Sequence, residues 1–195
     1  WDNIREQRRE RMIKMGLIRP EWPLTERDDR IKSWEETENK EWEIHRMAVY
    51  AAQIDRLDQG VGRIVKALED TNRLDNTLIL FLADNGGCDE IINGALTRHG
   101  DFPRGGTRPD VFPGEPDTYA SYGFGWANAS NTPFRRYKKW IHEGGIASPL
   151  VAHWPQVIAA QGELRSQVGH VTDLMATCID LAGADYPTEC RGNAV

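Results

Sequence analysis

The fold is decided by one stretch of the sequence, Asn76-Thr-Leu-Ile-Leu-Phe-Leu-Ala-Asp-Asn-Gly-Gly87. Its apolar part, 77–83, has the length of a strand and no alternation of polar and apolar residues. Such a run is typical of a strand covered on both faces of a parallel sheet. A long amphipathic segment precedes it, and the order helix then strand is typical of an α/β protein. We therefore expect an α/β domain with a mixed or parallel sheet flanked by helices.

An amphipathic helix is predicted over about 40–71, immediately before this strand. Its apolar residues follow the three-and-four spacing of one buried face. They are Met47, Tyr50, Ala51, Ile54, Leu57, Val61, Ile64, Val65 and Leu68. Gly60 and Gly62 lie inside this helix, where each glycine costs about 1 kcal/mol relative to alanine. We expect these glycines to permit close packing of the helix on the sheet.

The rest of the chain divides into shorter segments around this helix and strand. A polar helix over about 2–15 should end at Gly16, and Ser33 with Glu36 fits a capping box. A second strand is expected near 149–154 and a second amphipathic helix over 171–181, ended by Gly183. The expected divisions are an irregular and helical lead-in (1–39), a helix and strand (40–85), a long loop (86–135), and a basic segment with a strand and a helix (136–195).

The composition is that of one globular domain and excludes several classes of protein. The chain has 195 residues, of which 39% are hydrophobic and 28% charged, as in ordinary soluble domains. Its formal charge of -6 argues against a nucleic-acid binder, which usually presents a basic face. No apolar run approaches the roughly 20 residues that span a bilayer. The chain opens without a methionine or a signal peptide, so we expect its beginning to be a cut.

Polar residues with metal-ligand chemistry follow the predicted strand. Asp84 and Asn85 come directly after the apolar run and precede Gly86 and Gly87. Ligands of open α/β sheets bind beyond the carboxyl ends of the strands, and carboxylate and amide oxygens suit calcium or magnesium. The glycines let the backbone turn sharply around a ligand. The same residues also fit a plain Asx turn at the end of a strand, so the pattern alone leaves both interpretations open.

A basic segment lies at the far end of the glycine-rich loop. Lys138 stands five residues before Glu143-Gly144-Gly145 and offers an anionic group a point charge with three donors. With its basic neighbours it also fits a solvated surface. His142 adjoins the Glu-Gly-Gly turn and is therefore the histidine whose position best fits a ligand contact.

Four phrases of the sequence, taken in order, resemble the sulfatase family and within it bacterial arylsulfatases. The first is Tyr50-Ala-Ala-Gln-Ile-Asp-Arg-Leu-Asp-Gln-Gly-Val-Gly62, which looks like the family's long helix. The second, 76–87, resembles the family's metal-binding strand and turn. The third, 126–155, contains Lys138-Lys-Trp-Ile-His-Glu-Gly-Gly145 and is similar to its lysine segment and following strand. The fourth, 170–184, is similar to a late helix of the same domain.

This resemblance implies an alkaline-phosphatase-like α/β fold and hydrolysis of sulfate esters, either small molecules or sulfated glycans. It implies a calcium ion held by two aspartates of an early strand and an Asp-Asn pair, which maps onto Asp84 and Asn85. The family's sulfate-contacting lysine maps onto Lys138, and we expect His142 to add a substrate contact. Specificity in the family lies largely in variable loops such as Asn93–Tyr122. The resemblance also implies a periplasmic or secreted protein.

The sequence departs from the family pattern in its nucleophile and in half of its metal site. The family nucleophile is a formylglycine made within a Cys/Ser-x-Pro-x-Arg motif, and no cysteine or serine here fits that motif. The chain has three cysteines, Cys88, Cys178 and Cys190. The early aspartate pair is also absent. We therefore expect a partial catalytic domain that is inactive alone and binds calcium weakly, because affinity depends on ligand number and charge.

Two alternatives remain open at the level of the sequence. The first is a phosphatase or phosphodiesterase of the same superfamily, which would use zinc. Asn85 supplies an oxygen ligand and so favours calcium over zinc. The second is a non-catalytic scaffold or binding protein that kept the fold and lost the chemistry. An upstream modification motif would support the enzyme, and its absence from an intact gene would support the scaffold.

Overall fold

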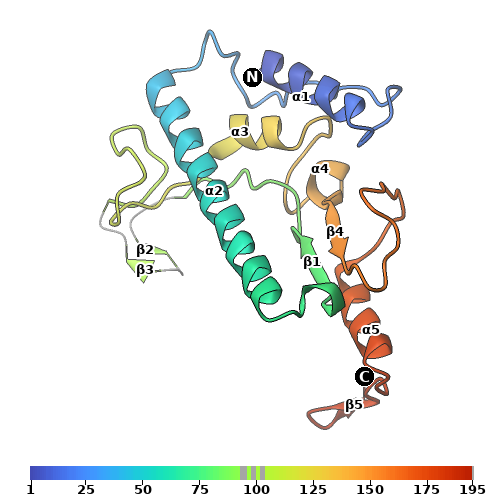
Figure 1. Ribbon diagram of the computed structural model, residues 1–195. Coiled ribbons are helices and arrows are strands. Elements are labelled where there is room, and N and C mark those ends of the chain that lie inside the picture. The colour runs from blue at the N-terminus through green and yellow to red at the C-terminus, as the bar shows by residue number, and fades with distance from the viewer. Residues whose placement is uncertain (93–95, 98–99, 102–103, 195) are drawn as a thin grey trace. The chain divides into compact units, whose positions relative to one another are not determined.

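The computed structural model describes residues 1–92, 96–97, 100–101 and 104–194, and it divides into two units, Trp1–Gln161 and Gly162–Val195 (Figure 1). The first unit contains α1 (Asp2–Lys14), α2 (Lys40–Asp70), the 3-10 helix η1 (Leu74–Asn76), β1 (Ile79–Leu82), β2 (Leu96–Thr97), β3 (Gly100–Asp101), α3 (Gly123–Ser130), α4 (Glu143–Ile146) and β4 (Leu150–His153). The second unit contains α5 (Val171–Leu181), β5 (Glu189–Cys190) and β6 (Asn193–Ala194). The expected mixture of helices and strands is therefore present.

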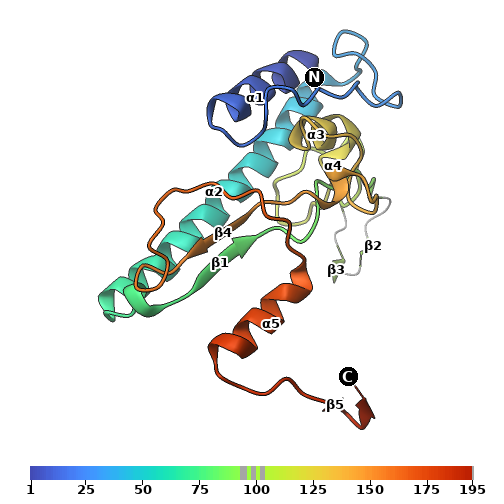
Figure 2. The ribbon, with the colours of Figure 1, turned by 90° about the vertical axis from the view of Figure 1, so that its right-hand side faces the viewer.

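The predicted strands form, and they pair with each other in the antiparallel sense. β1 pairs with β4 in an antiparallel register that sets Ile79 opposite His153 and Leu82 opposite Leu150 (Figure 2). Phe81 is 48% exposed, so β1 is not covered on both faces within this unit. The antiparallel pairs are compatible with the mixed sheet that was one of the two expectations, whereas a purely parallel sheet is wrong for the described strands. The reason is that the chain returns to the end of β1 before it enters β4, so β4 runs back along it.

Helix α2 has the predicted bounds, but its buried residues, Trp42 and Arg46, both lie in its first two turns. Trp42 is 5% exposed and its Nε1 donates to Val111 O at 2.8 Å. Farther along, Ile54, Leu57 and Ile64 lie on one face yet are 46%, 51% and 61% exposed. The prediction of a continuous buried face is therefore wrong for this chain. Spacing identifies the residues that share a face, but it does not supply the surface that covers them.

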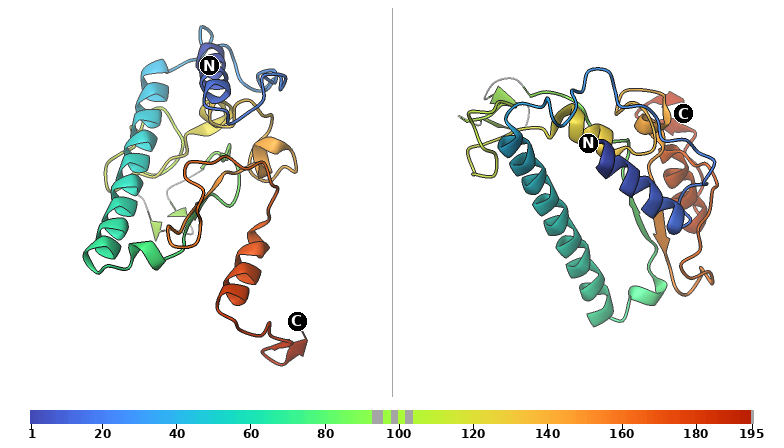
Figure 3. Two further views of the ribbon diagram at one scale, coloured as in Figure 1. Left: turned by 45° about the vertical axis from the view of Figure 1, so that its right-hand side comes forward. Right: turned by 90° about the horizontal axis from the view of Figure 1, so that it is seen from above.

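The two glycines in the second half of α2 do not have the expected role in close packing. A Cβ added to Gly62 would meet no atom within 4 Å, and one added to Gly60 would approach only Arg63. Neither glycine therefore packs closely against another element in the described part of the chain. Figure 3 shows α2 as one uninterrupted rod despite both glycines.

The hydrophobic core lies where the lead-in meets α3. Trp1 packs edge-on against Trp126, with ring centroids 4.7 Å apart, and against Trp34, with centroids 4.9 Å apart. The lead-in therefore carries part of the core.

The expected long loop over 86–135 is wrong in part, because it contains α3. Glycines and asparagine hide this helix from a search for periodicity, since they have low helix propensity. Gly125 is required there, because a Cβ would lie 2.7 Å from the Trp1 ring.

Predicted helix ends are confirmed in both units. Gly16 has φ 74 and follows α1 as expected, and Gly183 has φ 61 and follows α5. The Ser33–Glu36 box forms, with Glu36 N donating to Ser33 Oγ at 3.2 Å, but it closes a turn and α2 begins only at Lys40.

No helix in the described residues is long and apolar enough to cross a membrane. The predicted specificity loop Asn93–Tyr122 includes residues 93–95, 98–99 and 102–103, which lie outside the described residues.

Candidate functional site

The turn that leaves β1 is bonded directly to the lysine segment. Gly86 N donates to Gly145 O at 2.9 Å, and Lys138 N donates to Gly87 O at 3.1 Å. Two segments that are about 50 to 60 residues apart in sequence therefore share backbone hydrogen bonds. This contact fixes the backbone of Lys138 beside the turn that follows Asp84 and Asn85.

Gly86, Gly87, Gly144 and Gly145 lie at this contact, and the backbone of each is closer to a neighbouring atom than a side chain allows. A Cβ on Gly86 would lie 1.8 Å from Gly144 O, and one on Gly145 would lie 2.0 Å from Trp140 O. A Cβ on Gly87 would lie 2.5 Å from the Tyr122 hydroxyl. Close approach, and not an unusual backbone angle, is therefore the reason for glycine at these positions.

Asn131 ties the same two segments together through its side chain. Its Oδ1 accepts from Gly87 N at 2.8 Å, and its Nδ2 donates to Arg136 O at 2.9 Å. The amide therefore uses both of its ends to bridge the turn and the lysine segment. Reasoning from the sequence missed this residue, because an asparagine after a short helix is indistinguishable from an ordinary capping residue.

Asp84 and Asn85 present oxygen atoms at the end of β1. Asn85 Nδ2 donates to Gly86 O at 2.8 Å, which leaves its Oδ1 available as an acceptor. Asp84 is exposed. This donor set fits a hard divalent cation such as calcium. No group of three or more histidine, cysteine, aspartate or glutamate side chains that could hold a metal ion gathers in the described ranges.

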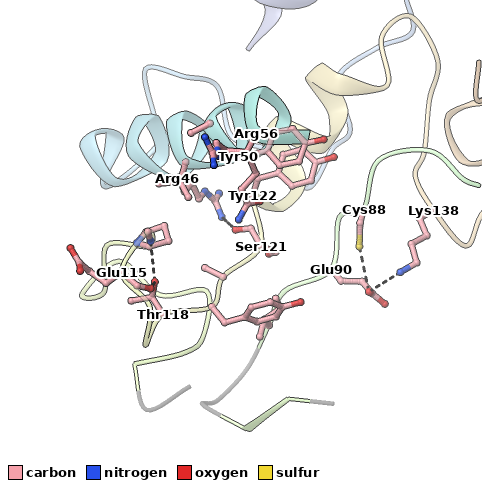
Figure 4. A pocket seen from close by; sticks show the side chains of 18 of the residues that line it. Arg46, Tyr50, Arg56, Cys88, Glu90, Glu115, Thr118, Ser121, Tyr122 and Lys138 are labelled. Atoms are coloured by element: carbon pink, nitrogen blue, oxygen red, sulfur yellow. Dashed lines mark hydrogen bonds and ion pairs between the residues drawn. The ribbon is translucent and has the colours of Figure 1, made fainter. Parts of the chain in front are cut away.

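The side chain of Lys138 reaches the carboxylate of Glu90, which belongs to no motif of the sequence. Its Nζ lies 3.5 Å from Glu90 Oε2, and Lys139 pairs with the other oxygen, Oε1. Cys88 Sγ donates to Glu90 Oε2 at 3.3 Å (Figure 4). The hydrogen bond from Lys139, followed by the one from Cys88, lowers the pKa of Glu90 to about 2. Glu90 is therefore a carboxylate at neutral pH.

Lys138, Lys139, Cys88 and Glu90 lie in the wall of an open cleft. Its volume is about 1210 Å³, and its other walls come from α2 and from the segment 113–122 (Figure 4). Tyr50 and Tyr122 stack there with ring centroids 4.6 Å apart. Burial and the nearby Tyr50 raise the pKa of Tyr122 to about 12. The cleft therefore joins a cationic end to a wall of stacked aromatic rings.

His142 is not among the described residues that line the cleft. Its ring stacks on Trp140 with centroids 6.0 Å apart, and its backbone carbonyl accepts from Gly145 N at 2.7 Å and from Ile146 N at 3.2 Å at the start of α4. A substrate contact of His142 therefore stays a prediction.

An ion pair between the buried carboxylate of Asp28 and the partly exposed Arg30 contacts the lysine segment. Asp28, with its side chain 5% exposed, accepts from Arg30 at 2.8 Å and 2.7 Å and lies 3.5 Å from Arg136 Nη1. Arg30 also lies 3.7 Å from Asp89 Oδ2. Tyr137 is fully buried, and burial followed by the nearby Asp28 carboxylate raises its pKa. The lead-in thus bonds to both the lysine segment and the segment after β1.

The pairing of Asp28 predicts a loss of stability in acid. Its hydrogen bonds to Arg30 hold its pKa well below the usual value. The free energy it contributes is therefore fully present above about pH 4 and is lost as the pH falls below that value. We expect Asp28→Asn to lower the free energy of unfolding by about 2 kcal/mol at neutral pH, because Arg30 is partly exposed and the pair is screened. Urea denaturation at several pH values measures this difference.

In this experiment the gap between Asp28→Asn and the unmodified chain should narrow as the pH falls from about 5 to about 2. Asp29→Asn is the matched control, because Asp29 is the exposed neighbour and should leave both the stability and its pH dependence unchanged. A gap of constant size across that range would contradict an ionised Asp28 in the folded state.

Comparisons with known proteins agree on one family. The family model described as Sulfatase matches residues 2–184. An uncharacterized sulfatase of Schizosaccharomyces pombe is 32% identical over 198 residues, which cover 95% of this chain and 34% of that protein. An arylsulfatase of Klebsiella aerogenes is 30% identical over 197 residues, which cover 95% of this chain and 40% of that protein. An N-acetylgalactosamine-6-sulfatase of Sus scrofa is 30% identical over 140 residues, which cover 72% of this chain and 20% of that protein.

The chain thus spans at most 40% of the length of these three relatives. The matched region contains the turn after β1, the lysine segment and the contact between them. The match over residues 2–184 also implies the alkaline-phosphatase-like α/β fold of that domain. The chain therefore belongs to the sulfatase family.

Proposed function

We propose that the protein containing this chain hydrolyses sulfate esters, with Lys138 binding the sulfate group and Asp84 and Asn85 supplying part of a calcium site. One observation carries the proposal. The hydrogen bond from Lys138 N to Gly87 O, at 3.1 Å, holds the lysine backbone beside the turn that follows the two candidate ligands. A tetrahedral anion needs positive groups on more than one side. Lys138 would supply one of them, and a cation held by Asp84 and Asn85 would supply another from a segment distant in sequence.

Each residue has a distinct role in this proposal. Lys138 supplies an ammonium group with three donors, which offsets negative charge on the sulfate oxygens as it develops. Asp84 and Asn85 contribute a carboxylate and an amide oxygen to the metal. Calcium, when bound, would polarise the sulfate group as a Lewis acid. Lys138 is then the catalytic residue of this chain, and His142 is at most an additional contact.

The remaining parts of the proposal concern groups outside these residues. The nucleophile, a formylglycine, and the other two metal ligands would come from a segment of the protein that this chain does not contain. The substrate would be a small sulfate ester or a sulfated glycan, and the protein would be periplasmic or secreted. On this view the chain is a partial catalytic domain and is inactive alone.

Removing a metal ligand provides the test. In the complete protein, Asp84→Asn should raise the calcium concentration that supports half-maximal hydrolysis of 4-nitrophenyl sulfate by about tenfold, because affinity depends on the number of charged ligands. Excess calcium should restore activity, and chelation should abolish it. Asp58→Asn is a matched control, because Asp58 is an exposed aspartate on α2.

Two outcomes of the same assay would reject the proposal. The first is undiminished hydrolysis of the sulfate ester by the chelated protein. The second is zinc-dependent hydrolysis of 4-nitrophenyl phosphate in preference to the sulfate, which would indicate a phosphatase of the same superfamily. If an intact protein hydrolysed neither the sulfate ester nor the phosphate ester, the result would instead support a non-catalytic member of the fold.

A further inference from the structure

Glu90 stands between the candidate sulfate-binding lysine and its neighbour. The Lys138 ammonium lies 3.5 Å from one carboxylate oxygen, and Lys139 pairs with the other. The side chains of Lys138 and Glu90 are 40% and 41% exposed, and both line the cleft. An anion that binds Lys138 from the cleft must therefore approach Glu90 closely.

This arrangement gives the cationic end of the cleft a net charge of one instead of two. Lys138 and Lys139 contribute two positive charges, and Glu90 removes one of them. Glu90 can release Lys138 without losing all its partners, because Lys139 and Cys88 Sγ bond to it as well. The carboxylate is therefore positioned to stay nearby after an anion has displaced it from Lys138. The repulsion that it exerts on a bound anion grows in proportion to that anion's charge.

We propose that Glu90 is a specificity-determining residue, whose carboxylate favours singly charged sulfate esters over doubly charged anions at Lys138. The inference rests on the proposed function, in which Lys138 binds the sulfate group. A sulfate monoester carries one negative charge at neutral pH, whereas inorganic sulfate carries two and a phosphate monoester nearly two. Glu90 therefore disfavours phosphate monoesters as substrates and weakens the binding of the sulfate product, which speeds its release.

The test compares one anion of each charge on the chain carrying Glu90→Gln. Methyl sulfate is the singly charged probe and inorganic sulfate the doubly charged probe, both titrated at constant ionic strength. Binding is followed by the backbone amide NMR signals of Gly87, Lys138 and residue 90. A charge about 4 Å away in a water-like dielectric changes affinity about fivefold for each unit of ligand charge. Glu90→Gln should therefore tighten methyl sulfate about fivefold and sulfate about 25-fold.

Glu115→Gln is the matched control, because Glu115 lines the same cleft and forms no ion pair with a described residue. Glu115→Gln should change the affinity for each probe less than twofold, because the Glu115 carboxylate lies farther from Lys138 than the Glu90 carboxylate does (Figure 4). Equal tightening of both probes by Glu90→Gln, or no tightening of either, overturns the proposal. It is also overturned if neither probe shifts these signals in Glu90→Gln.

A third variant separates this inference from the proposed function. Lys138→Gln should remove the response to both probes. If both anions still shift the signals in Lys138→Gln, the proposed role of Lys138 fails, whatever Glu90→Gln does. If Lys138→Gln removes binding and Glu90→Gln changes both affinities equally, the proposed function stands and the role of Glu90 is rejected.

Discussion

Replacing Lys138 with methionine in the complete protein should lower kcat/KM for 4-nitrophenyl sulfate by about 10²- to 10³-fold. This is the usual effect of removing one preorganised group that offsets charge in a transition state. Methionine keeps the length of the side chain and removes its charge. The backbone contact between Lys138 N and Gly87 O does not depend on the side chain, so the turn after β1 should keep its place. Steady-state kinetics measure the loss.

Lys139→Met is the matched control for that prediction. Lys139 is the adjacent lysine and also pairs with Glu90, but its side chain is 62% exposed and its φ is 79. Because the backbone of Lys139 is left-handed and not extended, its side chain leaves the backbone in a different direction from that of an extended residue. We expect Lys139→Met to lower kcat/KM by no more than about fivefold, through the charge it removes. If the two variants lose activity equally, Lys138 has no special role.

The second large effect concerns stability. Gly86→Ala should lower the free energy of unfolding by about 3 kcal/mol or more, the upper range for overpacked positions. A Cβ at Gly86 would lie 1.8 Å from Gly144 O and 3.2 Å from Gly145 Cα. Both neighbours are backbone atoms, so no side chain can turn aside to relieve the clash. The turn after β1 must then separate from the lysine segment, and urea denaturation measures the loss.

Gly62→Ala gives the opposite expectation in the same chain. A Cβ there would meet nothing within 4 Å, and alanine is favoured over glycine in a helix by about 1 kcal/mol. The pair of variants therefore distinguishes a glycine required by close packing from one that is not. Equal changes in stability for Gly86→Ala and Gly62→Ala would mean that the backbones at Gly86 and Gly144 do not approach closely in solution.

The local elements of this protein can be predicted from its sequence, and their partners cannot. The apolar run 77–83 and the spacing within α2 correctly indicate a strand and a helix, because both patterns reflect local geometry. The direction of β4 depends on where the chain returns, and that return depends on the contact between Gly86 and Gly145. The sequence contains both glycine pairs, 86–87 and 144–145, but the hydrogen bond that joins Gly86 to Gly145 exists only in the folded chain.

The candidate site is likewise only partly predictable from the sequence. Asp84, Asn85 and Lys138 were found through motifs, since their residue types suit a metal and an anion. Glu90, Asp28 and their partners were missed, because ordinary charged residues become informative only when distant segments bring them together. A pair of acidic residues at 89–90 and a pair of lysines at 138–139 are complementary in charge. Charge alone, however, does not identify which of the chain's many acidic residues would pair with these lysines.

Helix α2 has unequal support along its length, and this has a consequence for how the molecule opens. The first turns are held by the Trp42 indole on Val111 O and by the Trp126 indole on Glu43 O. The last turns expose their apolar side chains, so breaking them forfeits little buried area. Thermal fluctuations should therefore unwind α2 from its Asp70 end toward Trp42. The amides nearest the cleft would then outlast those beside η1 in exchange with solvent.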